Sequence, residues 1–146
     1  YMFGDRPALA DFGMWGQLYE CWTDPTPRAL IDQLYPTTWR WIERMLQPKV
    51  EGGWDSWSSI RWGISRLLDS EVCGMFLPWS SANAAALQGG QEQFTVMLDG
   101  RPFTQQAQKY HARSLAEIKR KYQAAKNAPG LETILNETGC LRWLED

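Results

Sequence analysis

The chain has 146 residues, of which 44% are hydrophobic and 22% charged, a composition typical of one globular domain rather than of a disordered chain. Its net charge of −2 provides no general field that would attract nucleic acid or an anionic membrane surface, so we expect neither as a partner. No apolar stretch approaches the roughly 20 residues that cross a bilayer, and the N-terminus lacks the layout of a signal peptide. We therefore expect a soluble, cytoplasmic protein.

The cysteine and histidine content argues against several kinds of site. Cys21, Cys73 and Cys140 are odd in number, far apart and without a CxxC pair, which predicts reduced, mostly buried thiols rather than disulfides or a zinc site. His111 is the only histidine, which excludes multi-histidine metal sites and argues against a Ser-His-Asp arrangement. We expect no metal site in this chain.

The first predicted helix begins at Ala8 or Leu9 and ends at Trp22. Apolar and aromatic side chains recur there at steps of three and four residues, which predicts that they share one buried face. These residues are Leu9, Phe12, Trp15 (or Gly16), Tyr19 and Trp22. The segment "TDPTP" at residues 23–27 ends this helix, because its two prolines cannot continue it.

A second helical stretch over residues 28–46 is interrupted by Pro36. We expect a short helix that ends at Leu34 and another that begins with Pro36 in its first turn, where the missing N–H group costs little. The predicted buried stripe of this next helix consists of Trp39, Ile42 and Leu46.

The middle of the chain is predicted to hold two further helices separated by a break. The first covers residues 56–71, and Pro78 marks the break after it. One of the two serines at residues 80–81 then caps a short, alanine-rich helix that stops at the Gly-Gly pair of residues 89–90.

The period of the pattern then changes. Apolar residues alternate over residues 94–98, and the Asp-Gly pair at residues 99–100 is typical of a hairpin turn. Pro102 restricts the return strand to an edge or to irregular pairing. We expect either a small hairpin or an extended loop.

The longest predicted helix covers residues 105–126, and a short helix follows over residues 131–137. The core face of the long helix is expected to consist of Tyr110, Ser114, Leu115, Ile118, Tyr122 and Ala125. We interpret its basic run at residues 119–121 as a solvated face, with a nucleic-acid-binding surface as the alternative. The tail is expected to dock through Leu141, Trp143 and Leu144. These elements predict an all-α fold with one small β-hairpin or extended loop.

Asp11 stands among apolar side chains at the start of the first helix, and three roles are open for it: a helix cap, a buried ion-pair partner or a catalytic group. In a capping box, an acid at the third helical position accepts a hydrogen bond from the N–H group of the N-cap residue, whose hydroxyl makes the reciprocal bond. Here Ala8 takes the N-cap position, so only the half of the box made by Asp11 can form. We favour this structural capping role.

The residues around this helix resemble a known family. "GDRPALADF" at residues 4–12 resembles the loop and capping box in the C-terminal helical domain of glutathione S-transferases, although Ala8 replaces the family's Ser or Thr. "YPTTWRWIERM" at residues 35–45 is similar to the next helix of that family. The remainder of the chain looks like the long C-terminal extension of a bacterial branch of the family.

The resemblance implies a single domain over residues 1–146, a helical bundle in which residues 1–48 match the capping-box helix and the next helix and residues 49–146 form an extension. In the family, a thioredoxin-like N-terminal domain binds glutathione and supplies the catalytic Ser, Tyr or Cys. No position here matches that domain, so we expect no catalytic and no cofactor-binding residue, and glutathione as a cofactor only if the missing domain is supplied.

Two functions follow from the resemblance. The leading interpretation is a non-catalytic, stand-alone helical module that binds a partner or a hydrophobic ligand. The alternative is the C-terminal portion of a glutathione-dependent transferase whose catalytic half is missing from this chain.

Aromatic residues supply the candidate ligand site and the candidate dimer surface. The helical domain of the family holds the hydrophobic co-substrate, and the residues that we expect to form such a pocket, or else to pack between helices, are Trp54, Trp57, Trp62, Phe76 and Trp79. Asn83 is either satisfied by backbone groups or a polar anchor in that pocket. The resemblance also implies that this chain lacks helices that cover the first helix and the helix at residues 35–46 in the family. Together with the nine tryptophans, this predicts a homodimer that buries Trp15, Trp22 and Trp39; the competing outcome is a monomer whose C-terminal extension folds back over the uncovered surface.

Overall fold

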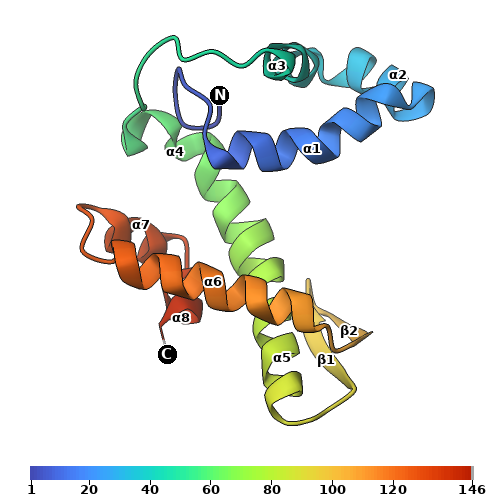
Figure 1. Cartoon of the computed structure of the whole chain (residues 1–146), viewed down its shortest axis with the longest axis vertical. Coiled ribbons are helices and arrows are strands. Elements are labelled where there is room, and N and C mark those ends of the chain that lie inside the picture. The colour runs from blue at the N-terminus through green and yellow to red at the C-terminus, as the bar shows by residue number, and fades with distance from the viewer. Residues whose placement is uncertain (146) are drawn as a thin grey trace. The chain divides into compact units, whose positions relative to one another are not determined.

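The computed structural model describes residues 1–145 and divides the chain into two compact units (Figure 1). Unit 1 spans Tyr1–Trp62 and unit 2 spans Gly63–Asp146. Most of both units is helical, but unit 2 also contains a two-stranded antiparallel sheet. The predicted all-α bundle of the glutathione S-transferase type is therefore wrong: the fold is mostly helical with a two-stranded sheet, which is the small hairpin that the prediction allowed, and its helices do not form one bundle but are divided between two units. That both units belong to one domain stays a prediction.

Unit 1 contains α1 (Leu9–Thr23), α2 (Pro25–Leu34), α3 (Pro36–Leu46) and the first part of α4 (Trp57–Arg66). One residue, Asp24, separates α1 from α2, and its carboxylate accepts a hydrogen bond from Thr26 N at 2.8 Å. The second helix begins before residue 28 because Pro25 and Pro27 occupy its first turn, where backbone N–H groups have no partner within the helix.

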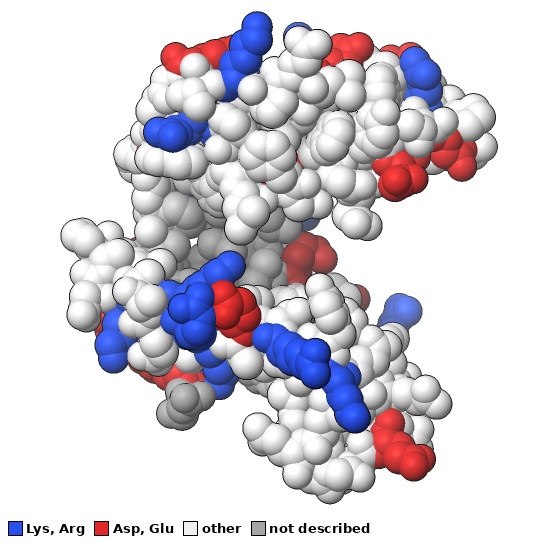
Figure 2. Space-filling view, viewed as in Figure 1, with Lys and Arg blue, Asp and Glu red and all other residues white. Residues whose placement is uncertain are grey.

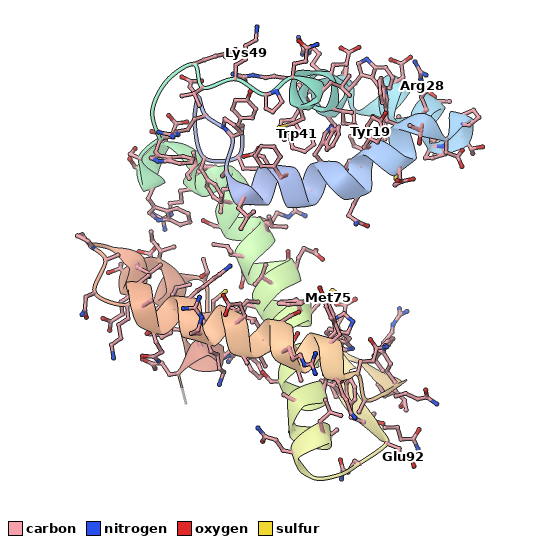
Figure 3. The ribbon with its side chains drawn as sticks, in the orientation of Figure 1. Tyr19, Arg28, Trp41, Lys49, Met75 and Glu92 are labelled. Carbon is pink, nitrogen blue, oxygen red and sulfur yellow. The ribbon has the colours of Figure 1, made fainter. Side chains whose placement is uncertain are left out.

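The buried face of α1 is rotated from the predicted one. Leu9 is 78% exposed and Phe12 is 46% exposed, so the prediction that they lie in the core is wrong. Asp11 is fully buried instead, one residue before Phe12 and two after Leu9. Aromatic contacts, with ring centroids 4.8–5.4 Å apart, join Trp15 to Tyr19, Tyr19 to Trp22, and Trp22 to Trp39 (Figure 3 labels Tyr19). The helical period is as predicted, but Asp11 occupies a core position.

The buried face of α3 also differs in part. Ile42 and Met45 are buried, whereas Leu46 is 45% exposed and does not belong to the stripe as predicted. The reason lies in Trp41, whose indole N–H donates to Asp11 of α1 at 3.2 Å and thereby sets which side of α3 faces that helix.

The first residues of the chain pair with the segment before α4. Gly4 and Trp54 form an antiparallel bridge, and Asp5 N donates to Gly53 O at 3.0 Å. Gly4 has a φ of +129°, and a Cβ atom there would lie 2.6 Å from Asp55 N, so only glycine fits. This pairing holds the N-terminal segment against the start of the next helical stretch.

Unit 2 contains the end of α4 and every later element. These are the π-helical segment η1 (Leu67–Phe76), α5 (Leu77–Gln88), β1 (Gln93–Leu98), β2 (Arg101–Gln106), α6 (Lys109–Ala125), α7 (Leu131–Glu137) and α8 (Leu141–Leu144). The predicted ends of α5 at the Gly-Gly pair and of α7 at residue 137 are confirmed.

The helix break predicted at Pro78 is wrong, since η1 passes directly into α5. A proline inside an α-helix has no N–H group to donate, and its ring clashes with the carbonyl four residues earlier, here that of Gly74. The π pattern, in which Leu77 N donates to Val72 O, widens the turn before the proline. The helical path therefore continues through Pro78 instead of ending there.

The small hairpin is confirmed. Asp99 and Gly100 both have positive φ values, 49° and 72°, as a two-residue type I′ turn requires. The strands pair in register from Gln93 with Gln106 to Leu98 with Arg101. Because β2 continues to Gln106, α6 begins at Lys109 and not at residue 105 as predicted.

The core of unit 2 is formed by η1, α5, α6 and the C-terminal helices. Its buried residues are Cys73, Leu77, Leu115, Tyr122, Cys140 and Leu144. Leu141 and Trp143 pack against it, which confirms the docking of the tail, and Cys73 and Cys140 are free buried thiols as predicted. Burial raises the pKa of the Cys140 thiol. Tyr110, at 74% exposure, and Ala125 are exposed and do not belong to the core face of α6.

Candidate ligand-binding site

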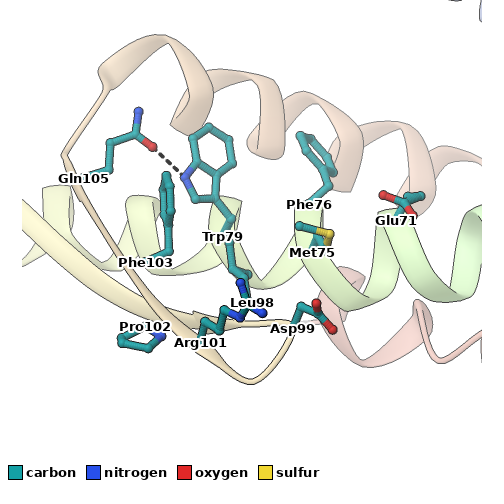
Figure 4. A pocket seen from close by; sticks show the side chains of 10 residues that line it. All are labelled: Glu71, Met75, Phe76, Trp79, Leu98, Asp99, Arg101, Pro102, Phe103 and Gln105. Atoms are coloured by element: carbon teal, nitrogen blue, oxygen red, sulfur yellow. Dashed lines mark hydrogen bonds between the residues drawn. The ribbon is translucent and has the colours of Figure 1, made fainter.

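An open groove lies in unit 2 between a helical wall, formed by η1 and α5, and the inner face of the hairpin (Figure 4). Its volume is about 730 Å³, which is typical of sites that hold small organic ligands. It is lined by Glu71, Met75, Phe76, Trp79, Leu98, Asp99, Arg101, Pro102, Phe103 and Gln105. All of these residues belong to unit 2, so this unit forms the groove by itself.

The helical wall is built at the transition from π to α geometry. Met75 and Phe76 are the last residues of η1, and Trp79 lies in the first turn of α5. The ring centroids of Phe76 and Trp79 are 6.4 Å apart. Segments of π-helix are uncommon and often mark functional sites. Here the π segment supplies two of the three apolar side chains of this wall.

The indole of Trp79 is fixed by three neighbours. Its Nε1–H group donates to Gln105 Oε1 at 2.8 Å, shown as the dashed line in Figure 4. The ring of His111 packs edge-on against it, with centroids 4.7 Å apart, and the ring of Phe94 lies 6.5 Å away. Trp79 therefore presents a preorganised surface to the groove, and the single histidine has a packing role.

The hairpin supplies the opposite wall through one face of its pleat, together with Pro102, whose partner in the register is Met97. Residues that pair directly across antiparallel strands share a face. The pairs on the inner face are Phe94 with Gln105, Val96 with Phe103, and Leu98 with Arg101. The outer face carries Thr95 and Thr104, whose hydroxyl oxygens are 2.8 Å apart. The inner face is apolar except at its two ends.

Asn83 of α5 fixes the end of the hairpin. Its side chain is fully buried, its Nδ2–H group donates to Gln108 O at 2.9 Å, and its Oδ1 atom accepts from Gln108 N at 2.7 Å. The prediction that backbone groups satisfy Asn83 is confirmed, but the partner lies 25 residues away in the sequence. The two bonds tie α5 to the link between β2 and α6 and so keep the hairpin opposite Trp79.

Three charged side chains lie toward the turn end of the groove. Gln105, the partner of Trp79, marks the open end of the hairpin, and the Leu98–Arg101 pair lies four residues further along the strands, or about 13 Å. Asp99 is in the turn, and Glu71 precedes Trp79 by two turns of the helical wall. In residues 1–145 none of Glu71, Asp99 and Arg101 forms an ion pair. This end therefore carries a net charge of −1.

The five aromatic residues expected to form a pocket are not all in the same place. Phe76 and Trp79 line the groove, whereas Trp54, Trp57 and Trp62 belong to unit 1 and line no part of it. Trp54 is 56% exposed beneath the guanidinium of Arg6, and Trp62 is 91% exposed. Met75, Leu98 and Phe103 also line the groove and were not predicted; the alternation of the two strands places Leu98 and Phe103 on one face.

The N-cap of α1 is Ala8, as predicted, with φ −104° and ψ 166°. Asp11 Oδ2 accepts a hydrogen bond from Ala8 N at 2.9 Å, which confirms the half box. Asp11 Oδ1 accepts two more, from Met2 N at 2.9 Å and from Trp41 Nε1 at 3.2 Å. The carboxylate thus joins the N-terminal segment, α1 and α3, and it acts as a structural anchor as well as a cap.

The candidate dimer tryptophans are partly buried within unit 1 itself. Trp15 Nε1 donates to Ile42 O at 3.2 Å, and the guanidinium of Arg28 lies over the rings of both Trp22 and Trp39, at 5.5 and 4.9 Å (Figure 3 labels Arg28). Much of their surface is therefore covered within the same chain, and the homodimer stays a prediction.

The basic run on α6 is partly neutralised by its own helix. Arg120 and Lys121 are exposed and both pair with Glu117, at 2.7 and 3.9 Å. The hydrogen bonds from Arg120 hold the pKa of Glu117 below its usual range. Figure 2 shows basic side chains over this helix with acidic atoms between them.

Among the described residues there is no group of three or more acidic, cysteine or histidine side chains that could hold a metal ion, and none of the helices is long and apolar enough to span a bilayer.

Comparison of the chain with models of protein families, with curated proteins and with solved structures gives no match.

Proposed function

We propose that this protein is a non-catalytic binding module whose groove in unit 2 holds a small ligand with an apolar body. One observation carries the proposal: a groove of ligand size presents a preorganised tryptophan beside two phenylalanines that are still 36% and 43% exposed, Phe76 and Phe103. Burying such aromatic surface against a ligand is favourable, because apolar surface removed from water contributes about 25 cal/mol per Å².

The resemblance to glutathione S-transferases supports the same class of ligand, because the helical domain of that family supplies the site for a hydrophobic co-substrate. It also supports the second candidate, the C-terminal portion of a glutathione-dependent transferase. The observation that favours this candidate is the Ala8–Asp11 hydrogen bond, which lies at the residues that carry the resemblance.

A neutral aromatic probe tests the groove. We expect 2-naphthylmethanol to shift the indole N–H signal of Trp79 in a ¹⁵N-resolved NMR titration, with a Kd of about 0.1–1 mM, as a ligand of this size gives at modest efficiency per atom. The signal is assigned with Trp79→Phe.

Two matched variants locate the binding. Phe103→Ala removes a ring from the groove and should weaken binding at least about fivefold. Met97→Ala removes an apolar side chain of similar size from the outer face of the same hairpin, where Met97 is 59% exposed, and should leave the affinity unchanged. Equal effects of the two substitutions, or no shift of the Trp79 signal, would refute the proposed site.

A further inference from the structure

Arginine side chains of the described chain lie over five of its aromatic rings, whereas exposed rings such as those of Tyr35, Trp62 and Tyr110 have no arginine over them. In the described residues, a guanidinium lies 4.1–5.5 Å from the ring centroid in five pairs: Arg6 with Trp54, Arg28 with Trp22 and with Trp39, Arg44 with Tyr1, and Arg142 with Trp143. None of these pairs involves a ring of the groove. Phe76, Trp79 and Phe103 therefore keep their electron-rich faces free of any cation of the described chain.

The charges at the turn end of the groove have the complementary sign. The carboxylates of Glu71 and Asp99 come from opposite walls, η1 and the hairpin turn, and both residues are exposed and line the groove. Figure 4 shows Glu71 at the end of the drawn site away from Gln105. Arg101 is the one cation in the lining; it makes no ion pair with either carboxylate, and the net charge of the lining stays at −1.

We infer that the ligand of this groove is an organic ammonium ion, with its apolar body between Phe103 and Trp79 and its cationic group toward Glu71 and Asp99. Aromatic faces attract cations through their quadrupole, and ammonium groups with apolar substituents are the usual ligands of sites that combine aromatic rings with carboxylates. This inference rests on the proposed function, since it names the chemical class that the same groove accepts.

Three naphthalene probes of nearly equal size test the inference: 2-naphthylmethylammonium, 2-naphthylmethanol and 2-naphthoate. With the full chain at low salt, the Trp79 indole signal should report affinities in the order cation, neutral, anion, and the cation should bind about fivefold more tightly than the alcohol. Raising the salt concentration to 0.5 M should shrink this preference, because exposed charges are screened.

The charge-neutral double variant Glu71→Gln, Asp99→Asn keeps side-chain size, and asparagine tolerates the positive φ of residue 99. It should abolish the preference for the cation while leaving the affinity for the alcohol unchanged. Glu92→Gln is the control, because Glu92 is an exposed carboxylate of unit 2 that does not line the groove and lies well apart from Met75 in Figure 3. This control should retain the full preference.

The outcomes separate this inference from the proposed function. If the alcohol binds and Phe103→Ala weakens it, but the cation binds no more tightly, the groove is a ligand site and the inference about charge is wrong. The inference is also overturned if the anion binds most tightly, or if Glu92→Gln lowers the preference as much as the double variant. If no probe shifts the Trp79 signal, the proposed function and this inference fall together.

Discussion

Replacing Asp11 by alanine should destabilise unit 1 more than any other single loss of a cap in this chain. The carboxylate is fully buried and accepts hydrogen bonds from Met2 N, Ala8 N and Trp41 Nε1. A hydrogen bond to a charged group contributes about 1.5–3 kcal/mol, and a buried donor left without a partner costs about 1–3 kcal/mol. Water can reach part of the two backbone N–H groups, so we expect a loss of about 3 kcal/mol in the free energy of unfolding.

Asp24→Ala is the matched control. Asp24, the N-cap residue of α2, is likewise a capping aspartate in unit 1, but it is exposed and its carboxylate accepts a single hydrogen bond, from Thr26 N. Its loss should cost about 1 kcal/mol, which is the usual effect of removing a cap. The difference between the two variants isolates the part of the effect that comes from burial and from the two longer-range bonds.

Chemical denaturation followed by tryptophan fluorescence is the suitable assay, because seven of the nine tryptophans belong to unit 1. Asp11→Asn refines the result. Asparagine keeps one oxygen for Met2 N and Trp41 Nε1 but turns an NH₂ group toward Ala8 N, so its cost should lie between those of the two alanine variants. If Asp11→Ala costs no more than Asp24→Ala, the three bonds do not hold unit 1 together and this reasoning is refuted.

Other predictions can be checked with the same material. Ala8→Ser should raise the free energy of unfolding by about 0.5–2 kcal/mol, because the new hydroxyl completes the capping box; an unchanged midpoint would contradict this. Asn83→Leu should cost about 2 kcal/mol and shift the hairpin amide signals, because Gln108 N loses its acceptor and Gln108 O keeps only the longer bond from Ala112 N; unshifted strand signals would count against the tether. The isolated chain should neither conjugate glutathione to an electrophile nor bind it at micromolar concentration, and calorimetry or a turnover assay decides. Light scattering over a dilution series should show a species with twice the mass of one chain, which is 16.8 kDa. A single species at 16.8 kDa would exclude the homodimer.

Features decided by local chemistry could be predicted from the sequence. The Asp-Gly pair fixed the hairpin turn, and the glycines and prolines fixed the ends of α1, α5 and α7, because each of these signals acts through the backbone conformation of a few residues. The faces of the helices could not be predicted as well. The three-to-four-residue spacing in α1 fits more than one face, and a long-range partner, Trp41 of α3, decides that Asp11 and not Leu9 is buried.

The candidate site likewise combines features set by the local sequence with features set by long-range contacts. Sequence analysis placed Phe76 and Trp79 in a ligand site, but it grouped them with three tryptophans that are near in sequence and lie in unit 1. The second wall comes from a hairpin that begins 14 residues after Trp79. Hydrogen bonds within two residue pairs of long sequence separation, Asn83 with Gln108 and Trp79 with Gln105, bring that wall into place. Neither pair has a local pattern from which it could have been recognised.

The π segment explains why the two walls meet at this point of the chain. A regular α-helix would have ended before Pro78, and Trp79 would then have begun a separate element with no fixed position relative to Phe76. Because the wider π turn carries the helix through the proline, Met75, Phe76 and Trp79 form one continuous wall, and Asn83 on the same helix fixes the opposite wall. The segment η1, whose hydrogen bonds depart from the α-helical pattern, thus brings the walls of the groove together. This agrees with the general association of π geometry with functional sites.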